Sequence, residues 1–152
     1  MTSHSPDADA LHATVSLGPS SFRARVESGQ TLASCQALIA LLPYRGTVLH
    51  ARWSGEAVWS PLRASWPANS MLRQENATSH PRPGQLLLYA GRQSEPEILV
   101  AYGETRFASK FGPLFGNPVL TILERLDELA RIGRSILETG ASTLRIELMR
   151  NF

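Results

Sequence analysis

Two charged residues, Arg52 and Glu97, have the types and settings best suited to chemistry on a small polar molecule. A guanidinium group presents a planar fork of N–H donors that matches a pair of carboxylate or amide oxygens. A carboxyl group held beside such a molecule can act as a general base. We therefore predict Arg52 and Glu97 as catalytic residues. Two structural alternatives stay open, because Arg52 could pair with Glu56 on the surface and Glu97 could be an exposed charge where a strand begins.

The segment EILVAY, residues 97–102, predicts which way Glu97 points. Successive side chains of a strand point to opposite faces, so Glu97 and Leu99 share one face. The other face carries Ile98, Val100 and Tyr102. If that apolar set faces the core, Glu97 and Leu99 lie on the same side as Arg52, and Leu99 becomes a predicted binding residue.

Four more residues are predicted to contact a ligand: Glu56, Glu75, Asn76 and Arg106. Together with Arg52 and Glu97 they define an expected groove formed by residues 52–56, 73–80 and 95–107. The middle segment belongs to a long stretch rich in Pro, Asn and Ser, and long loops without structure of their own are usually functional or disordered. Polar loop residues also cap turns, so a structural role for Glu75 and Asn76 stays open.

Other polar and aromatic residues are expected to serve the structure. We predict that His50 is a hydrogen-bonded histidine of the core and that His80 is an exposed loop residue, although His80 could also act as a general base. Trp53 and Trp59 are predicted to pack the scaffold. Cys35 lies in an apolar helical pattern and is predicted to be a buried thiol.

Composition narrows the classes of function. The formal charge is +2, from 15 basic and 13 acidic residues spread along the chain, and no basic run predicts a nucleic-acid surface. No apolar run is long enough for a membrane span, and the amino terminus lacks a secretory signal pattern, so a cytoplasmic protein is expected. One cysteine and four scattered histidines predict no metal site, and no motif predicts a cofactor. The predicted partner is a small polar molecule, and a homo-oligomer is left open.

The hydrophobic pattern predicts one domain over residues 13–152, preceded by a disordered tail over 1–12. Apolar residues at helical spacing predict helices over 31–42 and 118–139, the second with Asn117 as its cap and Pro118 as its first residue. About seven alternating or apolar segments predict strands. Two helices among so many strands favour a mainly β (α+β) fold, a closed antiparallel barrel with the helices capping its ends.

Several stretches carry a family resemblance. TLASCQALIALL, TVLHARW, GQLLLYAG and EILVAYG follow one another as the corresponding elements do in cyclophilins. The chain resembles still more closely a bacterial family of uncharacterised proteins with a cyclophilin-like fold, over roughly residues 13–149. The resemblance implies a cyclophilin-like barrel and places Arg52 where prolyl isomerases have the arginine that binds the peptide. However, Glu97, Ile98 and Leu99 stand where those enzymes have a glutamine and an aromatic residue.

The sequence therefore predicts a small-molecule-binding protein with a cyclophilin-like fold. It could be a metal-free enzyme that acts on a small amide or heterocycle. The alternative is a protein-interaction or assembly module without catalysis. A residual peptidyl-prolyl isomerase is a third hypothesis.

Overall fold

The first two strands of this protein form where apolar and polar residues alternate. The structure, a computed structural model, describes residues 11–67 and 72–149. In β1 (His12–Leu17) every second side chain is buried, and β2 (Ser20–Val26) buries Phe22, Ala24 and Val26. Side chains of a strand point alternately to its two faces, so each strand offers one apolar face to a common interior.

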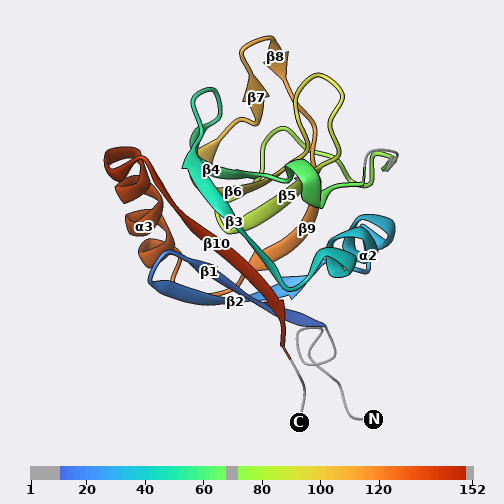
Figure 1. Cartoon of the computed structure of the whole chain (residues 1–152), viewed down its shortest axis with the longest axis horizontal. Helices are drawn as coiled ribbons and strands as arrows, with labels where there is room; N and C mark the ends of the chain where they lie inside the picture. Colours follow the sequence, from blue (N-terminus) through green and yellow to red (C-terminus); the bar gives the residue numbers. More distant parts are fainter. Residues whose placement is uncertain (1–10, 68–71, 150–152) are drawn as a thin grey trace.

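Eight strands of the described chain close into a single antiparallel barrel (Figure 1). The other six strands of the barrel are β3 (Tyr44–His50), β4 (Gly55–Pro61), β5 (Gln85–Tyr89), β6 (Glu97–Thr105), β9 (Asn117–Ile122) and β10 (Ala141–Leu148). Their order around the barrel is β1-β10-β3-β4-β6-β5-β9-β2. A 3-10 turn, η1 (Arg63–Ser65), follows β4, and a short hairpin of β7 (Ala108–Ser109) and β8 (Gly112–Pro113) projects beyond the barrel. The predicted mainly β, closed antiparallel barrel is confirmed.

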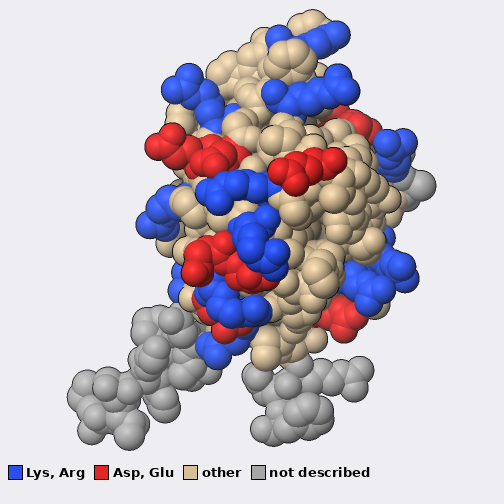
Figure 2. Space-filling model, turned by 90° about the vertical axis from the view of Figure 1, so that its left-hand side faces the viewer, with Lys and Arg blue, Asp and Glu red and all other residues tan. Residues whose placement is uncertain are grey.

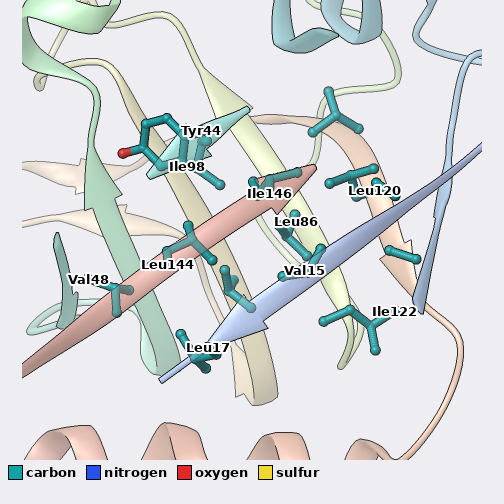
Figure 3. Close-up of a cluster of buried hydrophobic side chains, with 14 of the residues drawn as sticks. Val15, Leu17, Tyr44, Val48, Leu86, Ile98, Leu120, Ile122, Leu144 and Ile146 are labelled. Carbon is teal, nitrogen blue, oxygen red and sulfur yellow. The ribbon is translucent and has the colours of Figure 1, made fainter. Parts of the chain in front are cut away.

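Two helices, α2 (Leu32–Leu41) and α3 (Leu126–Thr139), lie on opposite sides of the barrel in Figure 1. The barrel interior is filled by the apolar side chains drawn in Figure 3. The buried faces of both helices join this same core, through Cys35 and Leu38 of α2 and through Leu129, Ile132 and Ile136 of α3. The prediction that the helices cap the barrel is therefore confirmed.

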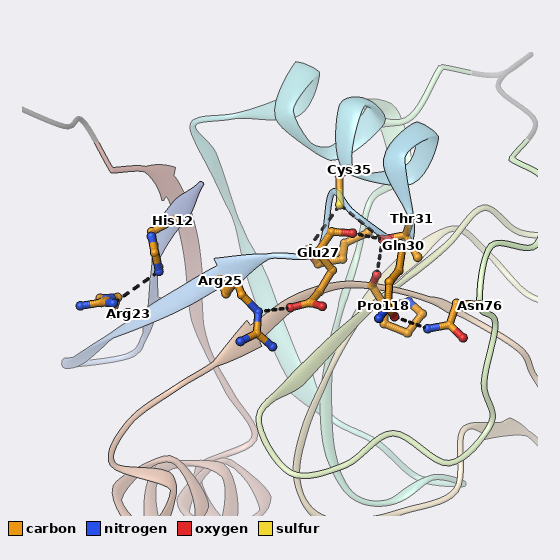
Figure 4. Close-up of polar contacts among 10 residues, drawn as sticks. His12, Arg23, Arg25, Glu27, Gln30, Thr31, Cys35, Asn76 and Pro118 are labelled. Carbon is orange, nitrogen blue, oxygen red and sulfur yellow. Dashed lines mark hydrogen bonds and ion pairs between the residues drawn. The ribbon is translucent and has the colours of Figure 1, made fainter. Parts of the chain in front are cut away.

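Helix α2 is fastened to β9 by buried polar contacts (Figure 4). Thr31 Oγ1 donates a hydrogen bond to the carbonyl oxygen of Pro118 at 2.6 Å. The thiol of Cys35 lies 3.4 Å from Thr31 Oγ1 and 3.6 Å from the carbonyl oxygen of Val119. Burial raises the pKa of this thiol, which keeps it protonated, and the prediction of a buried cysteine is confirmed.

The expected helix over 118–139 begins later than the sequence pattern predicts. Asn117–Ile122 is strand β9, which pairs with β2 and β5, and α3 begins at Leu126. A short apolar run suits a strand as well as a helix, and the two neighbouring strands decide the outcome here. In the observed helix, Leu126 and Leu137 are exposed. On its polar side Arg131 pairs with Glu128, and Arg134 pairs with Glu56 of β4.

Two smaller expectations also need correction. The segment TVLHARW is a strand only as far as His50, because β3 ends there and β4 begins at Gly55. Arg52 and Trp53 therefore stand on a turn and not on a strand. Most of the expected tail over 1–12 lies outside the described residues, and His12 already belongs to β1.

Candidate functional site

An open pocket of about 740 Å³ lies beside the outer face of β6. We call it the Glu97 pocket. Its walls come from the end of β3 and the following turn (49–53), Trp59 of β4, Gln93 and Ser94, Glu97 and Leu99 of β6, the 108–111 turn with Leu114, and Ile136, Leu137 and Gly140 at the end of α3. Segments distant in the sequence therefore meet at one hollow.

One apolar wall of this pocket belongs to a second hydrophobic cluster, on the outside of the barrel. Its buried members are Ala57, Leu87, Tyr89, Leu99, Phe107 and Leu114. The segment after β6 folds back over the sheet, and the ring of Phe107 meets that of Tyr89 edge to face at 5.5 Å. Because Leu99 belongs to this outer cluster while Ile98 and Val100 belong to the barrel core, the predicted division of faces along β6 is confirmed.

Glu97 lies within this apolar wall. It is the first residue of β6, opposite Pro61 of β4 and Tyr89 of β5, and its exposed fraction is 6%. Among the described residues its carboxyl group has no hydrogen-bond or ion-pair partner. Burial in this setting, helped by the nearby carboxylate of Glu95, raises the pKa of Glu97 to about 8. The group is therefore mostly a neutral carboxylic acid at pH 7, and it can donate a hydrogen bond.

Cationic side chains stand at the rim of the pocket. Arg52 is exposed and makes no ion pair or side-chain hydrogen bond with any described residue. Its expected partner Glu56 is engaged elsewhere, because Glu56 Oε2 lies 3.7 Å from Arg134 Nε and Glu56 Oε1 accepts a hydrogen bond from the Glu104 N–H at 3.0 Å. The ammonium group of Lys110 lies 4.9 Å from the ring centre of Phe111. Two cations are therefore available to an anionic group at the mouth of the pocket.

Aromatic side chains complete the mouth. Trp53 is 57% exposed and Phe111 is 77% exposed, whereas Trp59 is half-buried. Exposed aromatic groups around a concave site offer flat surfaces for a planar molecule. Trp59 packs against the outer hydrophobic cluster, as its predicted scaffold role requires, and it also lines the pocket. Trp53, which was also predicted to pack the scaffold, instead stands exposed at the mouth.

His50 also lines the pocket, but both of its ring nitrogens are engaged. Nδ1 lies 2.9 Å from the carbonyl oxygen of Ala51, which can only accept, so Nδ1 carries the proton. Nε2 therefore accepts a hydrogen bond from the hydroxyl group of Tyr102 at 2.7 Å. The ring is therefore held by two partners, as predicted, but its side chain is half-buried in the pocket wall and does not lie in the core.

The structure distributes the predicted site residues unevenly. Arg52, Glu97 and Leu99 line the Glu97 pocket, and Glu56, Glu75, Asn76 and Arg106 do not. Glu75 accepts hydrogen bonds from the Ala33 N–H at 3.2 Å and from the Ser34 N–H at 2.8 Å, at the amino end of α2. The side chain of Asn76 donates to Gln30 Oε1 at 2.9 Å (Figure 4). These contacts stabilise α2 and the loop before β5.

Sequence reasoning missed two kinds of pocket residue. Lys110 and Phe111 lie in the irregular stretch RFASKFGPLFG, whose residue types indicate no regular element. The available signal in that stretch is Phe111, a large apolar residue that stands directly before Gly112 and outside any apolar pattern. Ile136, Leu137 and Gly140 reach the pocket because of the packing of α3, for which the local sequence carries no signal.

A metal site, a membrane-spanning helix and a charged surface remain to be considered for the described residues. Among the described residues, no group of three or more His, Cys, Asp and Glu side chains is placed to hold a metal ion. No helix in that part of the chain is long and apolar enough to span a membrane. Figure 2 shows acidic and basic side chains interspersed over the face of the molecule that it presents.

The fold and pocket define a small antiparallel β-barrel protein with two covering helices and an open, aromatic-walled pocket on the outside of its wall. The chain belongs to the family described as "Protein of unknown function (DUF3830)", whose model matches residues 13–148. This match confirms the prediction that the chain belongs to an uncharacterised family.

McbB is among the solved structures that share the fold. The chain is similar to McbB, whose structure was determined in complex with tryptophan, with a TM-score of 0.66 and 17% sequence identity. The similarity covers 92% of this chain and 45% of McbB, so this chain spans less than half of that protein. No curated protein matches the chain.

Proposed function

We propose that this protein binds a small planar molecule that carries carboxylate or amide oxygens, and that the molecule lies in the Glu97 pocket. The observation that carries the proposal is the buried carboxyl group of Glu97, which lines the pocket without a described protein partner. Because the carboxyl group of Glu97 opens onto the pocket, a ligand that lies there can supply the missing hydrogen-bond partner.

Different pocket residues bind different parts of the ligand. Glu97, protonated at neutral pH, donates a hydrogen bond to an acceptor atom of the ligand. Arg52 binds the oxygen pair at the mouth, where its fork of donors suits a carboxylate or an amide. Trp53, Trp59 and Phe111 supply flat apolar surfaces for the planar part. The tryptophan in the McbB structure supports an aromatic carboxylate as the first probe, because the two proteins share the fold.

The proposal extends from binding to catalysis. A carboxyl group with a pKa near neutrality transfers protons efficiently at neutral pH. In a metal-free reaction on a small amide or heterocycle, Glu97 donates a proton to the substrate and then serves as the base, while Arg52 holds the substrate oxygens. The same proposal takes the barrel to be cyclophilin-like and the protein to be bacterial and cytoplasmic, on the sequence pattern and resemblance alone.

A second candidate function rests on the exposed apolar rim. Trp53, Phe111 and Leu137 all line the mouth of the pocket and are 57%, 77% and 66% exposed. Such a rim also suits a protein-interaction or assembly surface. Under this alternative, the Phe111→Ser and Leu137→Ser variants would lower self-association, and small aromatic acids would not bind.

Calorimetric titration with tryptophan, indole-3-acetate, benzoate and benzamide tests the proposal, with cyclohexanecarboxylate as the non-planar control. We expect at least one planar compound to bind, and we expect Glu97→Leu and Arg52→Ala to weaken it, because leucine cannot donate a hydrogen bond and alanine removes the guanidinium fork. Arg145→Ala removes an exposed arginine of β10 outside the pocket and serves as the matched control. Binding that Arg145→Ala weakens as much as Arg52→Ala, or the absence of binding by every planar compound, would contradict the proposal.

A further inference from the structure

A second hollow of about 560 Å³ adjoins the Glu97 pocket at Trp53, whose side chain lines both. We call it the Arg106 groove. Its walls are three short segments, 53–55, 80–83 and 103–106. Because Trp53 is 57% exposed and is shared by the two hollows, its indole ring forms part of a surface that runs from one hollow into the other.

Positive charge in the Arg106 groove is available to a ligand. Arg82 and Arg106 are both exposed, and neither forms an ion pair or side-chain hydrogen bond with a described residue. His80 uses Nδ1 in a contact of 2.9 Å with Ser79 Oγ, which leaves Nε2 open. Glu104 is the opposing charge within the groove. Two guanidinium groups therefore outnumber one carboxylate there.

The backbone holds the two arginines in a fixed relation. The Arg106 N–H donates to the carbonyl oxygen of Ser54 at 3.0 Å, and the next N–H, that of Phe107, donates to the carbonyl oxygen of Ser79 at 2.6 Å. The Arg82 N–H donates to Gln85 Oε1 at 2.7 Å. All three segments of the groove are thus tied together. A site whose backbone is already ordered loses less entropy when it binds.

We infer that the Arg106 groove is an anion subsite for the carboxylate or phosphate end of an elongated ligand whose planar part occupies the Glu97 pocket. Guanidinium forks bind carboxylate and phosphate groups through paired hydrogen bonds, and two of them face this groove. The middle of the ligand crosses the exposed ring of Trp53. This inference rests on the proposed function, because it extends the same ligand into the neighbouring hollow.

The subsite can be tested apart from the pocket with inorganic phosphate and with succinate. NMR titrations at constant ionic strength would follow the Nε–H signals of Arg82 and Arg106 and the indole N–H of Trp53. We expect saturable shifts, and we expect Arg82→Gln or Arg106→Gln to weaken binding by about tenfold or more. Glu104→Gln should tighten it, because the opposing charge is gone. Arg145→Gln, on β10 and outside both hollows, should leave the affinity unchanged.

Phenylalkyl phosphates of increasing chain length test whether one ligand spans both hollows. Affinity should rise once the chain is long enough to cross Trp53, and Arg106→Gln should remove that gain while benzoate binds as before. If benzoate binds in the Glu97 pocket but chain length brings no gain, the inference is overturned and the proposed function stands. If phosphate shifts the arginine signals but no planar compound binds, the proposed function fails and the spanning ligand fails with it. Shifts that do not saturate, or that Arg145→Gln reduces equally, would overturn the anion subsite itself.

Discussion

The ring of Tyr102 on β6 packs directly against the backbone of Gly133 on α3. A Cβ atom at position 133 would come within 2.6 Å of Tyr102 Cγ, a distance that real side chains do not adopt. The hydroxyl group of the same tyrosine is hydrogen-bonded to His50 at 2.7 Å, so the ring cannot move aside without losing that bond. The glycine thus allows the helix to approach the sheet closely, and this approach brings the end of α3 to the Glu97 pocket.

Gly133→Ala should therefore destabilise the protein, although alanine is the better helix former by about 1 kcal/mol. Overpacking of a filled core costs about 1–3 kcal/mol, and we expect this cost to win at position 133. Urea unfolding measures the change. Glu138→Ala, at an exposed position of the same helix, should leave the free energy of unfolding nearly unchanged. A Gly133→Ala variant as stable as the wild type would mean that the ring and helix separate at little cost.

The buried face of α3 supports a second prediction. Leu129 is fully buried in the core, whereas Leu137 on the same helix is 66% exposed. Leu129→Ala should cost on the order of 2–5 kcal/mol, because it removes buried methyl groups and leaves a cavity. Leu137→Ala should change the free energy of unfolding far less. Denaturant titration of both variants measures the two free energies of unfolding. Equal losses would mean that α3 is rotated about its axis, with Leu137 as buried as Leu129.

The contrast between β6 and β9 explains how far the fold could be predicted. Residues 97–102 are all buried, and the two-face geometry of a strand assigned Ile98, Val100 and Tyr102 to the core correctly. Residues 117–122 are also almost all buried, so there is no period to separate a strand from a helix, and here the signals at the start of the segment point the wrong way. Asn117 and Pro118 resemble a helix start, but the pairing of β9 with β2 and β5 overrides that signal.

The candidate site was predictable only where a strand fixes the direction of a side chain. Glu97 and Leu99 follow from the alternation of β6. Lys110 and Phe111 depend on how the segment after β6 folds back over the outer cluster, which no local pattern records. Glu75 shows the converse error, a residue predicted for the site that lies outside it. A loop carboxylate looks the same in the sequence whether it binds a ligand or a helix end.

Glu75 provides a third prediction. Its hydrogen bonds with Ser34 lower the pKa of its carboxyl group, so the charged form is favoured in the folded state. Glu75→Ala should cost about 0.5–2 kcal/mol, the range for removing a helix cap. The contribution of Glu75 is present above its ordinary pKa of 4.5 and is lost as pH falls through the lowered value. Urea unfolding at several pH values measures it. Gln74→Ala, at an exposed neighbouring position, is the matched control. Ligand binding that depends on Glu75 while stability does not would contradict the structural role.

The raised pKa of Glu97 gives a fourth prediction, on the dependence of stability on pH. The folded protein keeps this proton up to about pH 8, whereas the unfolded chain releases it near the ordinary value of 4.5. Between these values the folded state binds more protons, so stability falls as pH rises. With about 1.4 kcal/mol for each unit of pKa, the loss is on the order of 3–5 kcal/mol.

Urea unfolding of the wild type and of Glu97→Gln at pH 5.5 and pH 8.5 (about these values) would measure this effect. Glutamine does not titrate, so the variant should lose much less stability than the wild type over the same interval. Glu138→Gln, at an exposed position, should keep the wild-type dependence. If Glu97→Gln and the wild type lose stability equally, then Glu97 is ionised in the folded state and cannot be the proton donor of the proposed site.

Arg52 supports the last prediction, because it stands on a turn at the mouth of the pocket and its guanidinium group has no described partner. If a planar carboxylate binds there, Arg52→Ala should weaken binding by about 1.5–3 kcal/mol, the range for hydrogen bonds to charged groups. Arg52→Lys should also lose affinity, because an ammonium group cannot reproduce the two parallel hydrogen bonds of a guanidinium fork. Stability should barely change in either variant, since an exposed side chain without partners contributes little to folding. Calorimetric titration with the planar compound that binds best, run beside urea unfolding, separates the two roles. Unchanged affinity with a large loss of stability would show that Arg52 serves the barrel and not the ligand.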